Sequence, residues 1–147
     1  MARLALAAAF AALAATSGAA DDAVLFAKHC GACHGKAGVG VPGLAPPLAM
    51  AEWAKAGKPD SRDYVPAVVL NGLSGKLTAA GRTYRSVMPP QKQRSDEDIA
   101  TLANYVLAAL NAAPADFKPL TAADVATLRA TKTDHKTLLA MRARLVP

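Results

Sequence analysis

The sequence predicts an all-α protein, and three observations support this fold class. Residues 95–111 combine an N-terminal capping pattern with apolar side chains at helical spacing. Residues 121–128 repeat the capping pattern further along the chain. No run of β-branched residues shows the period of two that a half-buried strand requires. The 147 residues are enough for one domain with a modest core.

The first twenty residues have the layout of a secretory signal peptide. Arg3 precedes an apolar run from Leu4 to Ala15, and small residues lead up to Asp21. This run is too short for a membrane span, which needs roughly 20 apolar residues. We therefore expect residues 1–20 to be cleaved during export to the periplasm, and the mature protein to have no membrane span.

A short helix is expected after this segment, over residues 21–30. Asp21 and Asp22 can cap its start, and the apolar residues that follow lead into a pair of cysteines. Residues 35–50 are too rich in glycine and proline for regular structure, so we expect a loop there.

The two cysteines of the chain are Cys30 and Cys33, and His34 follows the second one directly. A redox disulfide, half of a zinc site and an attached haem are the three interpretations to compare. A thioredoxin-like motif belongs among alternating strands and helices, which this sequence does not contain. A structural zinc site needs four ligands, usually in two spaced pairs, and the remaining histidines, His29 and His135, form no pair.

The Cys-X-X-Cys-His spacing is instead the attachment signature of a c-type haem. Two thiols add across the vinyl groups on one edge of the porphyrin, and the next residue places its imidazole on the iron. The sequence therefore predicts one covalent haem c as the cofactor, bound through Cys30 and Cys33, with His34 as an iron ligand.

The second iron ligand is predicted to be Met88. His29 adjoins the attachment motif and cannot reach the other face of the ring, and Met50 follows the motif too closely. Met88 lies far along the chain in TYRSVMPPQKQ, where two prolines favour an extended backbone that presents the thioether from a stiff loop. The alternative, a methionine that fills the core, is usually found on a helix.

Two helices are expected between the attachment motif and the C-terminal part. Ser61 or Asp63 can cap the first, which ends at Gly72. The second starts with a capping box of Ser95 and Asp98. Its apolar stripe consists of Ile99, Leu102, Ala103, Val106 and Leu110.

Residues 112–147 form an extension with one or two short helices. Thr121 and Asp124 make a second capping box, and Asp134 can start another helix with Leu138, Met141 and Leu145 on one face. Two short amphipathic helices are not stable alone in water. Their apolar faces must pack either on the rest of this chain or on a partner protein, and the sequence leaves both choices open.

These motifs resemble those of class I monohaem cytochromes c. The similar stretches are CGACHG, PPLA, NGLSG, TYRSVMP, SDEDIA and LTAADVATLRA, within residues 22–130. The chain is most similar to bacterial cytochromes that accept electrons as subunits or partners of periplasmic dehydrogenases. The resemblance implies about three to five short helices around one covalent haem, in a domain of residues 21–111 that precedes the extension.

The resemblance also assigns roles to single residues. Pro46, twelve residues after His34, matches a proline whose carbonyl accepts the second N–H of the ligating imidazole. Leu48 would then line the haem pocket, or Pro47 should the register shift by one. We also expect Tyr84 and Arg85 to contact a haem propionate.

Two aromatic residues, Phe26 and Tyr105, match residues that pack the first helix against the last. Many relatives have a glycine where this chain has Asp22, so either the first helix is short or the helices cross less closely. His29, beside the haem edge, is expected to be exposed to solvent.

An iron bound by both histidine and methionine has no open position for a substrate, which predicts an electron carrier with no catalytic residues. The resemblance implies a periplasmic dehydrogenase or similar oxidoreductase as donor. Another cytochrome or a terminal oxidase of the respiratory chain is the implied acceptor. Two alternatives stay open: a haem sensor or enzyme in which a small molecule displaces Met88, and a haem-free module with a Cys30–Cys33 disulfide.

The chain is basic, with a formal net charge of +6. Basic residues flank the attachment motif and the loop that carries Met88, called the methionine loop below. We expect them to form a positive collar that steers acidic protein partners. No nucleic-acid partner is expected. The collar residues are Lys28, Lys36, Lys76, Arg82, Arg85, Lys92 and Arg94.

Overall fold

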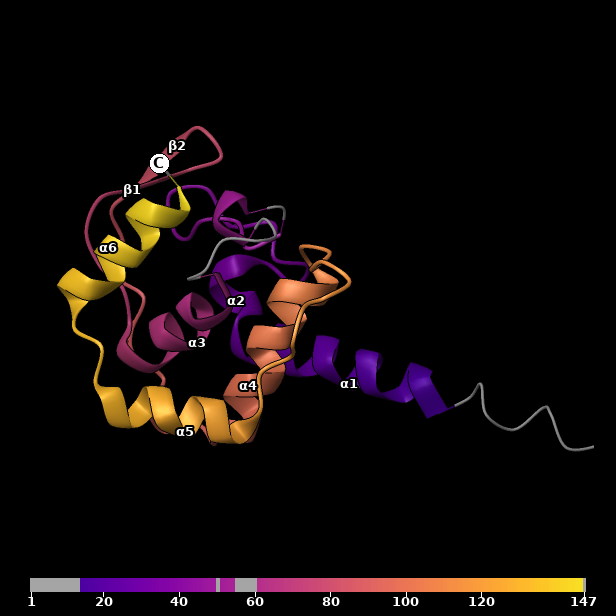
Figure 1. Cartoon of the computed structure of the whole chain (residues 1–147). Helices are drawn as coiled ribbons and strands as arrows, with labels where there is room; N and C mark the ends of the chain where they lie inside the picture. Colours follow the sequence, from indigo (N-terminus) through magenta and orange to yellow (C-terminus); the bar gives the residue numbers. More distant parts are fainter. Residues whose placement is uncertain (1–13, 50, 55–60, 147) are drawn as a thin grey trace, which may run out of the picture.

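The computed structural model describes residues 14–49, 51–54 and 61–146, and this part of the chain is mainly helical (Figure 1). The all-α prediction is confirmed, with one small antiparallel sheet besides the helices. The elements in chain order are α1 (Ala14–His29), α2 (Gly31–His34), the 3₁₀-helix η1 (Glu52–Ala54), α3 (Ser61–Asn71), β1 (Leu77–Ala79), β2 (Arg82–Tyr84), α4 (Asp96–Asn104), the π-helix η2 (Tyr105–Ala109), α5 (Ala122–Thr131) and α6 (His135–Leu145).

Helix α1 extends further towards the N-terminus than predicted. Asp21 and Asp22 lie inside it and do not cap it, because alanine-rich residues upstream favour continuation of the helix. The first turns of α1 project away from the other elements (Figure 1). Residues 1–13 of the predicted signal peptide lie outside the described part of the chain.

The first and last helices of the predicted cytochrome domain meet through two aromatic rings, as expected. Phe26 is fully buried, and its ring centroid lies 5.2 Å from that of Tyr105. The helix that begins after Ser95 is α-helical as far as Asn104 and then continues as the π-helix η2. The Ser95 hydroxyl accepts the predicted capping bond from the amide of Asp98 at 3.1 Å.

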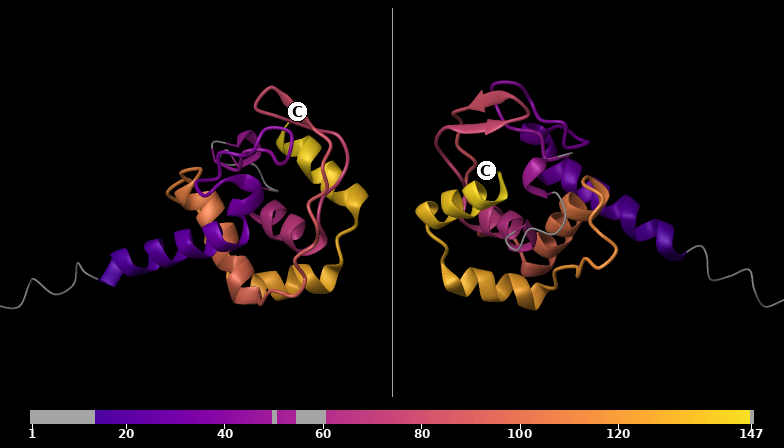
Figure 2. Two further views of the ribbon diagram at one scale, coloured as in Figure 1. Left: turned by 180° about the vertical axis from the view of Figure 1, so that it is seen from behind. Right: turned by 45° about the horizontal axis from the view of Figure 1, so that its top comes forward.

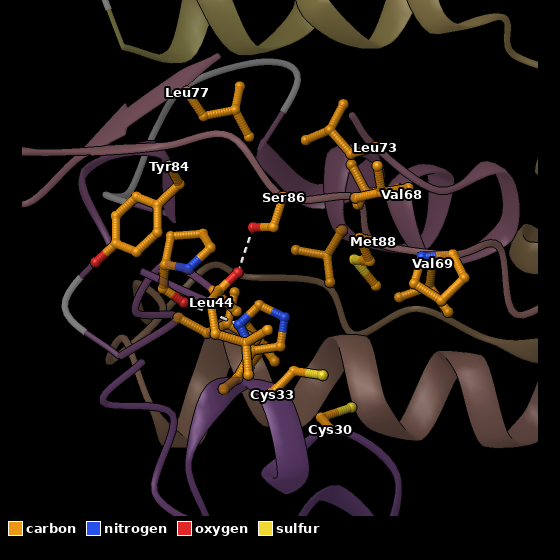
Figure 3. Close-up of a pocket in the computed structure, with 18 of the residues that line it drawn as sticks. Cys30, Cys33, Leu44, Val68, Val69, Leu73, Leu77, Tyr84, Ser86 and Met88 are labelled. Carbon is orange, nitrogen blue, oxygen red and sulfur yellow. Dashed lines mark hydrogen bonds between the residues drawn. The ribbon is translucent and has the colours of Figure 1, made fainter. Parts of the chain in front are cut away.

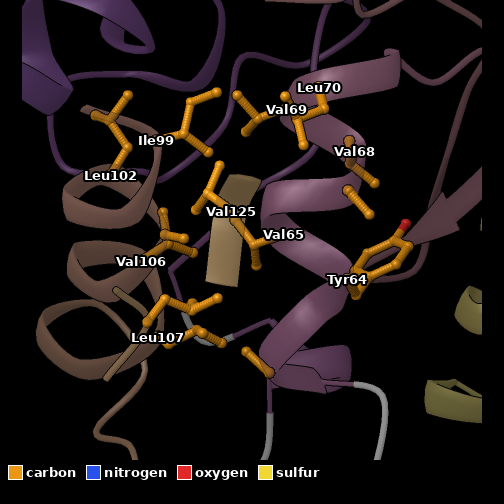
Figure 4. Packing of buried hydrophobic residues seen from close by; sticks show 14 of the residues in the cluster. Tyr64, Val65, Val68, Val69, Leu70, Ile99, Leu102, Val106, Leu107 and Val125 are labelled. Atoms are coloured by element: carbon orange, nitrogen blue, oxygen red, sulfur yellow. The ribbon is translucent and has the colours of Figure 1, made fainter. Parts of the chain in front are cut away.

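Helix α3 lies at the centre of the core. Its residues from Tyr64 to Leu70 are all buried, and they face side chains of α4 on one side (Figure 4). Val125 of α5 is fully buried beside Val65 of α3 and Val106 of η2. Gly72 follows the last turn with a φ of 74°, a left-handed conformation that suits glycine at a helix end.

Helices α5 and α6 pack back onto the same chain, which is the first of the two choices left open for the extension. Figure 2 shows α5 running beneath α4 and α3, and α6 rising beside α3 towards the hairpin. The predicted capping box of Thr121 and Asp124 is present, and the Asp134 carboxylate accepts a bond from the amide of Thr137 at 2.7 Å. Leu138 and Leu145 are buried in the same core as Phe26, so the extension completes this core.

The hairpin β1–β2 was not expected. Leu77 pairs with Tyr84 and Ala79 with Arg82, and Gly81 turns the chain with a φ of 70°. Strands of three residues are too short to produce a recognisable alternating pattern. Among the described residues, none of the helices combines the length and the apolar character that crossing a bilayer demands.

Candidate haem-binding site

A cavity opens between α2, α3, the hairpin and the loops that follow α2 and β2 (Figure 3). Aliphatic side chains form most of its lining, and they come from α3, β1, α4, η2 and the loops. Of the residues expected at the site, seven line this cavity: Cys30, Cys33, His34, Pro46, Leu48, Tyr84 and Met88.

The attachment motif forms a tight helical turn at the end of α1. The amide of Cys30 donates to the carbonyl of Phe26 at 2.8 Å, and the amide of His34 donates to the carbonyl of Cys30 at 2.8 Å. This turn places both thiols at the cavity wall, and they are not joined in a disulfide. Cys33 is exposed and Cys30 is half-buried, so one side of the motif is open to solvent.

His34 is held in one orientation by the loop that follows it. Its Nδ1 atom lies 2.8 Å from the carbonyl oxygen of Pro46, and since a carbonyl only accepts, Nδ1 carries the proton. The lone pair of Nε2 is then available for a metal. The side chain is 7% exposed, and this burial lowers the pKa of His34, which favours the neutral, ligating form.

The proximal loop, residues 35–49, is folded by glycines and by one asparagine. The carbonyl of Gly38 accepts bonds from the amides of Leu48 and Ala49, both at 2.8 Å. Asn111 donates to the carbonyl of Leu48 at 2.7 Å and accepts from the amide of Ala51 at 2.8 Å. These contacts fix the segment that presents Leu48 to the cavity.

Met88 enters the cavity from a different wall than the cysteines (Figure 3). Its backbone pairs with Leu73, with N···O distances of 2.8 and 3.0 Å. Gly72 makes this approach possible, because a Cβ atom there would lie 2.6 Å from the carbonyl oxygen of Met88. The stiff methionine loop that the sequence predicted is therefore anchored on the end of α3.

The other methionines and histidines either do not line the cavity or lie outside the residues that the structure describes. Met141 is buried in the core on α6, and His135 is exposed at the start of the same helix. Met50 lies outside the described residues. His29 is half-buried instead of exposed as expected, and burial together with Arg94 lowers the pKa of its imidazole.

The expectation for Arg85 is not supported. Tyr84 is 4% exposed and lines the cavity, whereas Arg85, the next residue along the extended chain, is exposed and does not line it. Of the segment from Tyr84 to Pro89, Arg85 is the one residue that does not line the cavity.

Sequence reasoning missed Arg142, which reaches the cavity from α6. Its guanidinium donates to the carbonyl of Thr78 at 2.8 Å and also hydrogen-bonds the hydroxyl of Tyr64. Burial raises the pKa of Tyr64, which keeps that hydroxyl protonated. No local pattern in the sequence signals this contact, because it depends on how the extension folds back.

The two loops also meet directly across the cavity mouth. The hydroxyl of Ser86, beside the methionine loop, donates to the carbonyl of Leu44 in the proximal loop (Figure 3). Leu44 and Val87 line the cavity and are nonetheless 45% and 69% exposed. The mouth therefore has an apolar rim that faces solvent.

The residues present fit a covalently bound haem. The cavity offers two thiols at one wall, a neutral imidazole, a thioether and an apolar interior. Tyr64, Tyr84 and Arg142 supply polar groups that suit carboxylates such as the propionates. The fold and the site together define a c-type haem protein.

Comparisons with known proteins agree with this class. Residues 18–106 match the family described as cytochrome C oxidase, cbb3-type, subunit III. The chain is also 38% identical over 128 residues to cytochrome c-552 of Thermus thermophilus, a match that covers 86% of this chain and 97% of the relative. A second cytochrome c-552 of that species, from a particular strain, matches at the same identity over 86% of its length.

The chain therefore belongs to the cytochrome c family, as a monohaem cytochrome c of class I. It carries covalently bound haem c with iron and transfers electrons; it is an electron carrier and not an enzyme. The resemblance inferred from the motifs is confirmed at the level of the family.

Proposed function

We propose that this cytochrome c binds its haem through Cys30 and Cys33 and holds the iron between His34 and Met88. The observation that carries the proposal is that the imidazole, oriented by Pro46, and the thioether line one apolar cavity. Bound there, the haem supplies a one-electron Fe(III)/Fe(II) couple. The protein keeps water out, holds both ligands in place and leaves part of the cavity mouth open.

The groups that line the cavity each raise or lower the reduction potential of the haem in a direction that follows from their chemistry. A thioether ligand stabilises Fe(II) and raises the potential, as does an apolar interior. The bond from His34 to Pro46 makes the imidazole a stronger donor, which acts in the opposite direction. The balance of these effects places the protein's potential above that of a haem with two imidazole ligands.

Tyr84 and Arg142 are the residues we propose for the propionates, in place of the pair Tyr84 and Arg85. Tyr84 is buried against the cavity, and Arg142 reaches it from α6 while Thr78 fixes its guanidinium. Pro46 and Leu48 shape the side of the cavity that faces His34.

The apolar rim of Leu44 and Val87 is the proposed site of electron exchange with partner proteins. Six of the seven predicted collar residues are exposed, and Arg94 is half-buried. Their positive charge suits partners with acidic surfaces, for which attraction speeds the encounter.

We further propose that the protein works in the periplasm, after cleavage of residues 1–20. Cleavage before Asp21 would leave the part of α1 that carries Phe26, and residues 18–21 are exposed in the full-length chain. The donor in this proposal is a periplasmic dehydrogenase or similar oxidoreductase, with the cytochrome as its subunit or free partner. The acceptor is another cytochrome or a terminal oxidase of the respiratory chain; the description of the matching family, an oxidase subunit, supports an oxidase.

The test replaces Met88 by alanine in the haem-loaded protein. We expect the haem to stay attached, the potential to fall and carbon monoxide to bind the ferrous form, because one iron position is then open. Met141→Leu is the matched control, since Met141 is a buried core residue on α6 and Leu conserves its volume. A wild-type protein that binds carbon monoxide as readily as Met88→Ala would contradict the carrier and favour the sensor or enzyme.

A further inference from the structure

One arginine of the extension clamps the segment that follows Met88. Arg129, on α5, donates to Asp96 Oδ1 from Nε and Nη2, at 2.9 and 2.7 Å. Its Nη1 donates to the carbonyl of Lys92 at 2.8 Å, and its Nη2 to the carbonyl of Arg94 at 2.9 Å. A planar guanidinium can satisfy a carboxylate and two carbonyls together, which a lysine ammonium cannot do in this geometry.

The clamped segment is a short, stiff continuation of the methionine loop. Met88 is paired with Leu73, and the amide of Gln91 donates to the carbonyl of Val69 at 2.8 Å. Between these two contacts lie Pro89 and Pro90, whose rings restrict the backbone. The segment is thus held on the α3 side at Met88 and Gln91, and on α5 by the Arg129 contacts at Lys92 and Arg94 directly after Gln91.

We propose that Arg129 is a positioning residue for Met88. By fixing residues 92–96 on α5, it keeps the methionine loop closed, so that the extension controls how often the thioether leaves the iron. The inference rests on the proposed role of Met88 as ligand. It gives the C-terminal extension a function at the haem that is distinct from its contribution to the core.

The structure contains a matched control for this clamp. Arg62, on α3, donates to Asp124 Oδ2 at 2.7 Å and to the carbonyl of Lys118 at 2.9 Å. Its side chain is 32% exposed and that of Arg129 is 34% exposed, so solvent screens the two similarly. Arg62 also fastens the extension to the rest of the protein, but its contacts lie at the start of α5 and not on the methionine loop.

The experiment measures how fast cyanide binds the ferric haem-loaded protein, because an external ligand must wait for Met88 to leave. Arg129→Gln should raise this rate about five- to tenfold, as expected when hydrogen bonds to a charged group are lost. Arg62→Gln should lower the unfolding temperature without changing the rate. Arg129→Lys should give a cyanide binding rate between those of the wild type and Arg129→Gln, because an ammonium group keeps the charge but cannot make all the hydrogen bonds of the planar guanidinium.

The ferric wild-type spectrum separates this inference from the proposed function. A methionine-ligated ferric haem has a weak charge-transfer band in the red, and a wild type without it would overturn Met88 as ligand and this inference with it. With the band present, equal cyanide rates in Arg129→Gln and Arg62→Gln would overturn the positioning role alone.

A milder variant covers the case in which Arg129→Gln does not fold. Asp96→Asn removes the ion pair and leaves the two carbonyl contacts of Arg129 in place. The cyanide rate should then rise about twofold, in line with a partly exposed pair. A rate equal to that of the wild type would count against the clamp.

Discussion

His34 and Pro46 are joined by a hydrogen bond of 2.8 Å from the imidazole Nδ1 to the proline carbonyl. The bond spans the proximal loop, and the backbone conformation of this loop requires a glycine at position 40. A Cβ atom on Gly40 would lie 2.6 Å from the nitrogen of Pro47 and 2.9 Å from the carbonyl carbon of Pro46. The carbonyl of Pro46 can therefore reach His34 only because Gly40, six residues before Pro46, has no side chain.

Gly40→Ala should weaken this bond and raise the reduction potential. A poorer acceptor makes the imidazole a weaker donor to the iron, which favours Fe(II), and we expect a change on the order of tens of millivolts. Gly43→Ala is the control, because Gly43 has nearly the same φ, 78° against 79°, and no atom within 4 Å of an added Cβ. Both variants should lose stability, measured by thermal unfolding, whereas protein-film voltammetry should show a change of potential for Gly40→Ala alone.

Gly72→Ala should loosen Met88. The added Cβ would meet the carbonyl oxygen of Met88 at 2.6 Å and the nitrogen of Pro90 at 2.9 Å, so the methionine loop must move away from α3. We expect a weaker red charge-transfer band in the ferric protein and carbon monoxide binding in the ferrous protein. Gly81→Ala carries similar backbone strain, with a φ of 70° and open space around the Cβ, and an equal loss of the band there would refute the steric explanation.

Arg142→Gln should lower the reduction potential. A positive charge at the cavity wall stabilises the form with the extra electron, and its loss should cost roughly 30–60 mV at 25 °C. Arg144→Gln, on the same helix but exposed and outside the cavity lining, should change the potential by much less. Voltammetry of both variants at high and low salt would decide, and equal changes would indicate a general surface-charge effect.

Asp124 should contribute to the acid sensitivity of the protein. Hydrogen bonds from Thr121, together with Arg62, lower the pKa of Asp124 from 3.8 to about 2. Because the folded-state pKa is the lower one, this contribution is fully present above pH 4 and is lost as the pH falls towards 2. Thermal unfolding of the wild type and Asp124→Asn between pH 6 and pH 2 should show a difference that shrinks in this window. A difference that stays constant over this range would contradict the role of Asp124.

Features set by local chemistry were predictable from the sequence. Ser95, Thr121 and Asp134 cap the helices expected of them, because each needs only an amide a few residues ahead. The cavity likewise gathers His34 and Met88, whose residue types and loop setting carry their own signal. The fold class and the main candidate site residues could therefore be proposed from the order of the amino acids alone.

Features set by distant contacts were not predictable. Arg142 reaches the cavity because α6 folds back along α3, and no pattern near residue 142 encodes that path. Arg85 was expected at the site for its charge, but the extended backbone turns Tyr84 inward and Arg85 outward. The π-helical continuation at Tyr105 was not predictable either, since its apolar spacing fits an ordinary α-helix equally well.

The wall that α6 contributes to the cavity has a consequence for the order in which the protein matures. The attachment thiols belong to the first elements of the chain, whereas Arg142 follows Cys30 by more than a hundred residues. During synthesis, the attachment motif therefore emerges long before the α6 wall of the cavity. The cavity is thus complete only when the extension has folded back along α3, so its last wall is made by the last helix of the chain.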